Sequence, residues 1–280
     1  MTDSAPDTNP LVSVIIPVYN GQRYIAETID SVISQTMEHW EIIAVNDGST
    51  DGSSSILEKY AGKMPGRIRP VTVENGGVSR ARNKGAALAR GKYLAFLDQD
   101  DLWAPGKLRS QVDFLDRNEG VGIVFSNETL IDENGRITRK CVLRLGSHQR
   151  GPVFENLLFG NFIPVSSVMV RKDLFCRAGG FDPKFSLAED FDLLLRISRE
   201  VPVDYIDEPL LFYREHRESG TSTKIDRITA EALEILRSWR EKDPSVFRKH
   251  FLKYQKFRMN FAVLKCKVVL KRWFSWSRSR

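Results

Sequence analysis

Three carboxylates lie within four residues at Asp98-Gln99-Asp100-Asp101, directly after the apolar segment 93–97. Carboxylates this close repel one another unless a counter-charge lies nearby. A Mg²⁺ or Mn²⁺ ion supplies that charge, because these ions bind one or two carboxylates together with the phosphate oxygens of a substrate. The alternative is a helix N-cap at Asp101, ahead of Leu102-Trp103, because Asp is a good capping residue. A cap uses one carboxylate and leaves the other two unexplained.

Two loops earlier in the chain offer groups that suit a nucleotide. Asp47 can accept a hydrogen bond from a nucleobase or a ribose, and the alternative is an Asx-type turn. The segment Asn75-Gly76-Gly77 joins a glycine-rich turn to a helix start, whose backbone N–H groups and dipole favour an anion. Arg80 and Arg82 add positive charge that suits a diphosphate. The segment matches neither a Walker loop nor a dinucleotide-binding fingerprint, so by itself it also fits an ordinary loop.

Glu189-Asp190 and His216 are candidates for proton transfer and for a further metal ligand. Two adjacent carboxylates can point in different directions, so that one acts as a base and the other orients it. The alternative is a solvated first turn of a helix, where acidic residues complement the dipole. His216 is a candidate metal ligand only if the segment 98–101 binds a metal, and it is otherwise a structural or solvated histidine.

The elements that must position these groups alternate between strands and helices. Short apolar, β-branched runs predict buried strands, and apolar residues at steps of three and four predict helices. The predicted order is strand 12–19, helix 24–35, strand 41–45, helix 53–60, strand 68–73, helix 78–89 and strand 93–97. This alternation implies an α/β protein with a doubly wound parallel sheet, whose ligands bind beyond the carboxyl ends of the strands. Asp47, the loop 75–77 and the segment 98–101 all follow strands at that edge.

The second half of the chain is less regular. We expect further elements there, in order: strand 122–125, strand 165–170, helix 189–198 and short extended pieces at 203–206 and 210–213.

Composition excludes several classes of protein. The chain has 280 residues, of which 41% are hydrophobic and 28% charged, and these values exclude a disordered or low-complexity protein. Its three cysteines follow no disulfide or zinc pattern, and no apolar run is long enough to span a bilayer. The polar N-terminus lacks the features of a signal peptide, so we expect a cytoplasmic protein.

The net charge of +6 is unevenly distributed along the chain. Residues 245–280 hold 11 Lys and Arg and no Asp or Glu, whereas residues 1–244 hold 31 basic and 36 acidic side chains. The basic excess therefore does not indicate nucleic-acid binding by the main domain. From Val246 onward, apolar residues recur at steps of three or four, which predicts a basic amphipathic helix. We expect residues 245–280 to bind an anionic membrane surface at the inner face of the cell membrane. Docking on the protein's own core or on a second subunit is the alternative.

Each of these signals is weak by itself, but their order is specific. The chain resembles the family 2 glycosyltransferases, inverting enzymes of the GT-A fold that use nucleotide-diphospho-sugars. The resemblance is carried, in chain order, by segments 12–20, 46–51, 75–77, 81–83, 91–101, 179–182 and 189–190. It implies a GT-A domain over residues 11–222, with a doubly wound mixed sheet flanked by helices. A helical, basic extension over residues 223–280 follows.

The resemblance also implies a role for each candidate residue. Asp190 is expected to be the general base that deprotonates the acceptor hydroxyl, and Glu189 to shape the acceptor site. Asp100 is expected to hold a Mg²⁺ or Mn²⁺ ion that bridges the diphosphate, with His216 as a further ligand. The residues expected to bind the nucleotide-sugar are Pro17, Tyr19, Asp47, Arg80 and Asp98.

The implied activity is that of an inverting, metal-dependent hexosyltransferase. It would move a sugar from a nucleotide-diphospho-sugar, with a UDP-sugar favoured, to a hydroxyl of a glycan or lipid-linked acceptor in bacterial surface polysaccharide or glycolipid assembly. The chain lacks a Q-x-x-R-W motif, which argues against a processive synthase. The alternatives are a nucleotidyltransferase and a non-catalytic membrane-docking protein with a transferase-like domain. No nucleic-acid partner is expected, and a homo-oligomer is left open.

Overall fold

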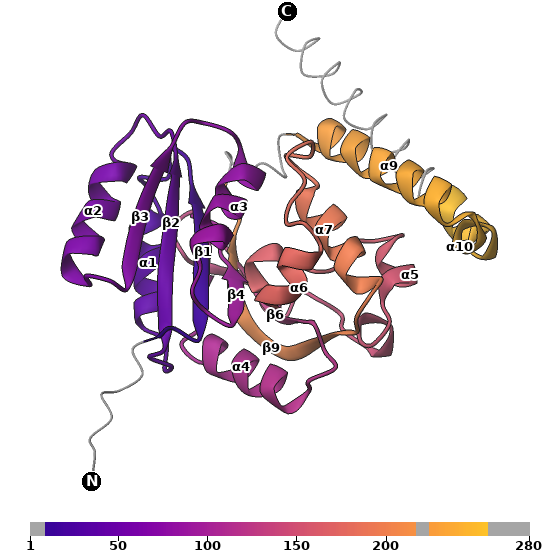
Figure 1. Cartoon of the computed structure of the whole chain (residues 1–280), viewed down its shortest axis with the longest axis horizontal. Helices are drawn as coiled ribbons and strands as arrows, with labels where there is room; N and C mark the ends of the chain where they lie inside the picture. Colours follow the sequence, from indigo (N-terminus) through magenta and orange to yellow (C-terminus); the bar gives the residue numbers. More distant parts are fainter. Residues whose placement is uncertain (1–8, 217–223, 257–280) are drawn as a thin grey trace, which may run out of the picture.

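The computed structural model describes residues 9–216 and 224–256, and Figure 1 shows one sheet flanked by helices. The strands are β1 (Val12–Val18), β2 (Trp40–Asp47), β3 (Ile68–Val73), β4 (Tyr93–Phe96), β5 (Leu102–Trp103), β6 (Ile123–Ile131), β7 (Ile137–Arg139), β8 (Met169–Arg171) and β9 (Val203–Arg214). The α-helices are α1 (Ile25–Ile33), α2 (Ser53–Lys63), α3 (Val78–Leu88), α4 (Lys107–Arg117), α5 (Phe154–Leu157), α6 (Lys172–Arg177), α7 (Glu189–Ser198), α9 (Ile225–Lys242) and α10 (Pro244–Lys249). Two 3₁₀ turns are η1 (Ser147–Gln149) and η2 (Val165–Ser167).

The sheet has the strand order β3-β2-β1-β4-β8-β6-β9-β5, and β7 pairs with β6. The pairs β1–β2, β1–β4 and β2–β3 are all parallel, as the alternation of strands and helices predicts. Strand β8 lies antiparallel to both β4 and β6, so the sheet is mixed. From β1 the chain winds first toward β3 and then to β4 on the other side. The carboxyl ends of β1 and β4 therefore form the topological switch point where α/β sheets bind ligands.

Several predicted elements in the second half of the chain differ from those observed, and the predicted strand 122–125 is the start of the longer strand β6. The segment 165–170 is a 3₁₀ turn followed by the short strand β8, not one strand. The two extended pieces at 203–206 and 210–213 are parts of one strand, β9, which pairs with β6 and with β5. Local sequence favours breaks at polar and proline residues, but pairing with a long neighbour carries the strand through them.

The capping interpretation of Asp101 is wrong. Leu102–Trp103 forms strand β5, antiparallel to Leu211 and Phe212 of β9, and the next helix begins only at Lys107. Asp101 therefore precedes a strand instead of a helix.

The core consists of two layers, one on each face of the sheet. Side chains of adjacent strand residues point to opposite faces, so Val14 and Ile16 pack into the layer with α1 and α4, while Ile15 packs into the layer with α3 and α7. Helix α3 lies especially close to the sheet, since a Cβ atom on Gly85 would be 2.6 Å from Cγ2 of Ile15. This close packing fixes the position of α3, whose first turns carry Arg80 and Arg82.

The C-terminal helices α9 and α10 pack on the same core layer as α7, at the upper right of Figure 1. Val246 and Phe247, the first residues of the predicted amphipathic stripe, are buried there. Phe251 and Leu252 are instead exposed, with exposed fractions of 56% and 80%. Tyr254, the next residue of the stripe after Phe251, packs on Phe247 with ring centroids 5.3 Å apart. The later residues of the stripe, at 257–268, and the predicted domain boundary at 222/223 lie outside the described residues. No helix in the described ranges is long and apolar enough to cross a membrane.

Candidate active site

A cleft of about 1000 Å³ opens at the carboxyl ends of β1, β2 and β4. It is lined by most of the residues that the sequence singled out, namely Pro17, Tyr19, Asp47, Asp98, Asp100, Glu189 and Asp190. Arg80 is exposed and lies outside this lining, and His216 reaches the site through a contact with Asp100. The fold thus joins residues 173 positions apart in the sequence in one cleft.

Asp47 closes the glycine loop 75–77 at the carboxyl end of β2. Its Oδ1 and Oδ2 atoms accept hydrogen bonds from the backbone N–H groups of Gly76 and Gly77, each over 2.8 Å. Gly77 has a φ of +87°, which favours glycine and turns its N–H toward Asp47. The two amides that the sequence offered to a phosphate are therefore occupied by the protein's own carboxylate.

Gln99 joins the loops after β1 and β4. Its Oε1 atom accepts a hydrogen bond from the N–H of Tyr19 over 2.8 Å, and its Nε2 atom donates to the Tyr19 carbonyl over 3.1 Å. These bonds hold the Tyr19 backbone at the cleft, and the Tyr19 side chain is 51% exposed. Sequence reasoning missed Gln99 because only its carboxylate neighbours carry an obvious chemistry.

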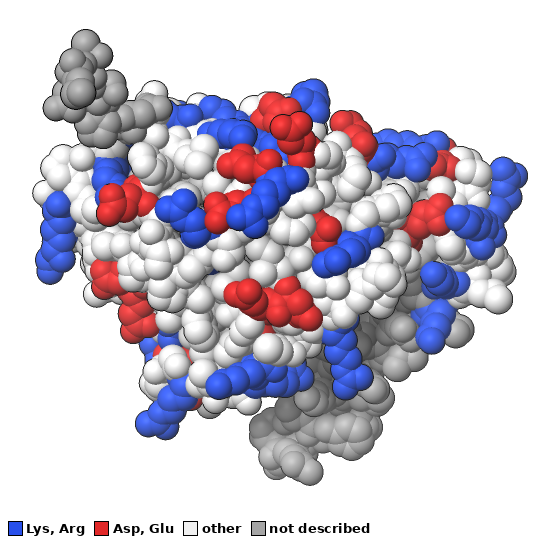
Figure 2. All heavy atoms as spheres, turned by 90° about the horizontal axis from the view of Figure 1, so that it is seen from below, with Lys and Arg blue, Asp and Glu red and all other residues white. Residues whose placement is uncertain are grey.

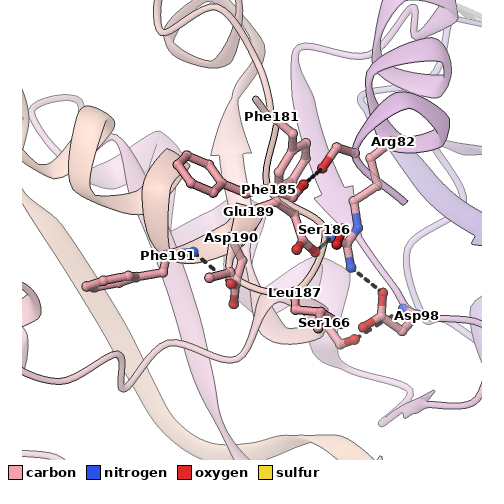
Figure 3. A network of polar contacts seen from close by, with 12 residues as sticks. Arg82, Asp98, Ser166, Phe181, Phe185, Ser186, Leu187, Glu189, Asp190 and Phe191 are labelled. Atoms are coloured by element: carbon pink, nitrogen blue, oxygen red, sulfur yellow. Dashed lines mark hydrogen bonds and ion pairs between the residues drawn. The ribbon is translucent and has the colours of Figure 1, made fainter. Parts of the chain in front are cut away.

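Arg82 is the central cation of the site, and only 2% of it is exposed. Figure 3 shows its guanidinium between two carboxylates, with Nη2 2.5 Å from Oδ1 of Asp98 and Nη1 2.6 Å from Oε1 of Glu189. Burial by itself would lower the pKa of Arg82, but the charges of Asp98 and Glu189 outweigh it and raise the pKa. Arg82 thus links the end of β4 to the start of α7, a role that its place in the segment 81–83 did not reveal.

Asp190 lies beside this network in the first turn of α7 (Figure 3). Burial raises its pKa to about 7, the charge of Glu189 adds to the rise, and Arg82 opposes it. Its Oδ2 atom accepts a hydrogen bond from Nδ2 of Asn161 over 3.2 Å, and its Oδ1 atom accepts one from the N–H of Phe191. A carboxylate with a pKa near neutrality in an open cleft has the properties of a general base.

Asp100 and His216 form the candidate metal-binding pair. The Oδ2 atom of Asp100 lies 2.8 Å from Nε2 of His216, although 116 residues separate them. No group of three or more acidic, histidine or cysteine side chains within the described ranges is arranged to hold a metal ion. The pair nevertheless fits a divalent ion that takes its remaining ligands from substrate phosphates, because Mg²⁺ and Mn²⁺ bind in that way. A nitrogen ligand beside the carboxylate shifts the preference toward a transition metal such as Mn²⁺.

Asp101 and Arg214 position Asp100 of the candidate metal-binding pair. Oδ1 of Asp101 accepts a hydrogen bond from the N–H of Arg214 over 2.9 Å, and Nε of Arg214 donates to the carbonyl of Asp100 over 2.8 Å. Both side chains are buried. Of the three clustered carboxylates, one is therefore structural, one is paired with Arg82 and one faces His216.

Comparisons with known proteins identify the family of this chain. The sequence model of "Glycosyl transferase family 2" matches residues 13–175. A glycosyltransferase of Rickettsia prowazekii is 34% identical over 224 residues, covering 79% of this chain and 69% of its own length. The "Putative teichuronic acid biosynthesis glycosyltransferase TuaG" of Bacillus subtilis is 44% identical over 152 residues, covering 54% of this chain and 60% of its own length. The chain spans only 35% of the length of similar glycosyltransferases from Rickettsia felis and Rickettsia conorii.

Two solved structures share the fold. Residues 1–349 of S. aureus TarS in complex with UDP-GlcNAc superpose with a TM-score of 0.65 at 20% identity, covering 80% of this chain and 65% of that one. The mannosyltransferase PcManGT from Pyrobaculum calidifontis, in complex with GDP-Man and Mn²⁺, gives a TM-score of 0.62 at 20% identity, covering 98% and 85%. At this identity the likeness concerns the fold, which is the predicted GT-A type. The match of the family model over more than half of the chain shows that the protein belongs to glycosyl transferase family 2.

Proposed function

We propose that this glycosyltransferase moves a sugar from a nucleotide-diphospho-sugar to an acceptor hydroxyl with inversion at the anomeric carbon. The observation that carries the proposal is the placement of Asp190 in the same cleft as Asp98 and Asp100. The cleft thus holds two carboxylates, Asp98 and Asp100, that suit a nucleotide-sugar and its cation. It also holds a separate carboxylate, Asp190, that can accept a proton. A single displacement needs both sets on opposite sides of the reacting carbon.

In this mechanism Asp190 accepts the proton of the acceptor hydroxyl while the acceptor oxygen attacks the anomeric carbon. The bond from that carbon to the diphosphate oxygen breaks, and the nucleoside diphosphate leaves with the electron pair. Arg82 keeps Asp98 and Glu189 paired, so Asp190 is the carboxylate of this cluster that is left to take a proton. A divalent cation held by Asp100 and His216 would stabilise the negative charge that develops on the diphosphate.

The donor and the acceptor are proposed by analogy with the similar proteins. TarS binds UDP-GlcNAc and PcManGT binds GDP-Man with Mn²⁺, so a nucleotide-diphospho-sugar with a divalent cation is the expected donor complex, and a UDP-sugar is favoured. TuaG is named for teichuronic acid biosynthesis. We therefore expect a glycan or lipid-linked acceptor of bacterial surface polysaccharide assembly.

The test begins with a thermal-shift screen of UDP- and GDP-sugars with and without Mn²⁺, since a ligand of the native state raises the melting temperature. The donors that bind are then incubated with a panel of p-nitrophenyl pyranosides, and products are identified by mass spectrometry and NMR. We expect transfer with inverted configuration and release of the nucleoside diphosphate. Release of pyrophosphate would instead indicate a nucleotidyltransferase. Asp190→Asn should bind the donor as the wild type does and lose transfer by about 10²- to 10⁴-fold, and unchanged transfer would exclude Asp190 as the base.

We further propose that the C-terminal region brings the enzyme to an anionic membrane surface. The supporting observation is the exposed pair Phe251 and Leu252, flanked by the exposed lysines Lys249, Lys253 and Lys256. On the face drawn in Figure 2, acidic and basic side chains are interspersed and form no broad basic patch. The proposal therefore rests on the C-terminal residues and not on the charge of that face. Apolar side chains beside lysines match the interface of an anionic bilayer.

Co-sedimentation with vesicles of phosphatidylglycerol and phosphatidylethanolamine tests this localisation. A chain that ends at His250 keeps Val246 and Phe247 in the core and should lose binding, as should the double variant Phe251→Glu/Leu252→Glu. Vesicles of phosphatidylcholine alone serve as the uncharged control. Equal sedimentation of the full chain and the shortened chain would contradict membrane binding.

A further inference from the structure

Glu128 is a buried carboxylate of the cleft for which the mechanism above has no use. It lies in the middle of β6, and only 9% of it is exposed. Its side chain lines the cleft together with that of Leu130, two residues further along the same face of the strand. In the sheet, β6 is two strands beyond β4, so Glu128 stands away from the nucleotide side formed by β1, β2 and β4.

The Glu128 carboxylate receives no hydrogen bond and no ion pair from any side chain or backbone group of the described residues. Burial raises its pKa to about 7, the charge of Arg139 lowers it and that of Glu215 raises it. Its carboxylate is open only toward the cleft, where water or a ligand can donate the hydrogen bonds that the protein does not supply.

Glu41 provides the contrast within the same protein. It is completely buried, but its carboxylate accepts hydrogen bonds from Ser13, Arg69 and Arg90, and the hydrogen bonds from Arg90, Ser13 and Arg69 lower its pKa despite its burial. Glu41 does not line the cleft and is fully explained as a structural residue. Glu128 is 9% exposed, its carboxylate accepts no hydrogen bond from the described residues, and its open side faces the cleft.

The surroundings of Glu128 define the chemistry of a ligand. Leu130, Leu143 and Phe162 give the same part of the cleft an apolar wall. Phe162 contacts Phe125 of β6, with ring centroids 6.1 Å apart, and it follows Asn161, which donates to Asp190. The apolar wall therefore connects the neighbourhood of Glu128 to that of the base. A sugar ring matches this combination, because it has an apolar C–H face and a rim of hydroxyl donors.

We propose that Glu128 recognises the acceptor sugar, whose adjacent hydroxyls donate to the Glu128 carboxylate while its C–H face packs on Phe162 and Leu143. This inference rests on the proposed function, and it deepens that function by assigning a pyranose with free hydroxyls to the acceptor side. Glu128 touches the acceptor away from the reacting hydroxyl, so it determines affinity and selectivity.

The experiment uses the p-nitrophenyl pyranoside to which the wild-type chain transfers in the test of the proposed function, together with its mono-deoxy analogues. Glu128→Gln keeps the shape of the side chain and removes the buried charge, so the variant should fold. We expect its acceptor KM to rise at least tenfold, with the donor KM unchanged. Removal of the recognised hydroxyl should weaken wild-type transfer about tenfold and have almost no further effect in Glu128→Gln. Glu119→Gln, an exposed carboxylate outside the cleft, is the matched control.

Failure of the two proposals can be told apart. Absence of transfer by the wild type counts against the proposed function. With the wild type active, an unchanged acceptor KM in Glu128→Gln overturns the inference. A parallel rise of the donor and acceptor KM values also overturns it, as does an equal loss for every deoxy analogue in both proteins.

Discussion

The Nη1 atom of Arg82 lies 2.6 Å from Oε1 of Glu189, a contact that joins α3 to α7 across 107 residues of sequence. The same guanidinium pairs with Asp98, so a single buried cation compensates carboxylates from two separate segments. Because the two carboxylates come from different elements, Arg82 ties the end of β4 and the start of α7 to α3 beside the cleft.

Removal of the Arg82 charge should therefore destabilise the protein strongly. Arg82→Met leaves Asp98 and Glu189 without a counter-ion, and breaking a buried pair from one side costs about 3–5 kcal/mol. Urea unfolding at pH 7.5 measures this cost. Arg80→Met is the matched control, since Arg80 lies two residues earlier and is exposed, and its effect should stay within about 0.5 kcal/mol. Similar losses in the two variants would show that Arg82 has no special structural role.

The pH dependence of transfer should report the ionisation of Asp190. Since the pKa of Asp190 is about 7, kcat/KM should fall as the pH drops through this value, because the protonated carboxyl cannot accept a proton. Asn161 donates to the ionised form and lowers the pKa, so Asn161→Leu should move this acid limb to higher pH. Rates measured from pH 5 to pH 9 test the shift. An acid limb that stays in place, or moves to lower pH, would contradict the assignment of the limb to Asp190.

The same carboxyl should make the enzyme less stable as the pH rises. Its pKa is raised from an ordinary value of 3.8 to about 7 in the folded state, so folding favours the protonated form. That contribution is present at low pH and is lost as the pH rises toward 7. Asp190→Asn carries no such charge and should be more stable than the wild type by up to about 4 kcal/mol at pH 8, with a smaller gain at pH 5. Equal gains at both pH values would indicate that the Asp190 pKa is not raised.

The pair Asp100 and His216 should govern the affinity for Mn²⁺. Asp100→Asn and His216→Ala each remove one ligand of the candidate site, and each should weaken Mn²⁺ binding in the presence of UDP or GDP by about 10- to 100-fold. Electron paramagnetic resonance of free Mn²⁺ measures this affinity without reference to turnover. Glu119→Gln should leave the affinity unchanged. Retention of wild-type affinity in both ligand variants would remove the pair from the metal site.

The sequence by itself predicted the architecture of the first hundred residues and most of the cleft. Each strand there is a short apolar run followed by polar residues, and parallel strands bring the residues that follow them to one edge. The positions of Asp47 and Asp98 therefore followed from local pattern. The strand β9 did not follow, because its course depends on pairing with β6 and β5 and not on its own residues.

The tertiary structure alone decided what each polar side chain does. Among three carboxylates within four residues, Asp98 pairs with Arg82, Asp100 faces His216 and Asp101 anchors Arg214, and these partners lie 16, 116 and 113 positions away. Arg80 and Arg82 have the same charge and similar sequence neighbours, but they point in different directions from α3, so that Arg82 is buried and Arg80 is exposed. The proposed role of Glu128 could not be predicted from the sequence for the same reason. It depends on a fold that places the side chain in the cleft and supplies no hydrogen-bond donor from the described residues. Residue type and spacing determine which elements form, whereas burial and the pairing of charges depend on distances that only the folded chain creates.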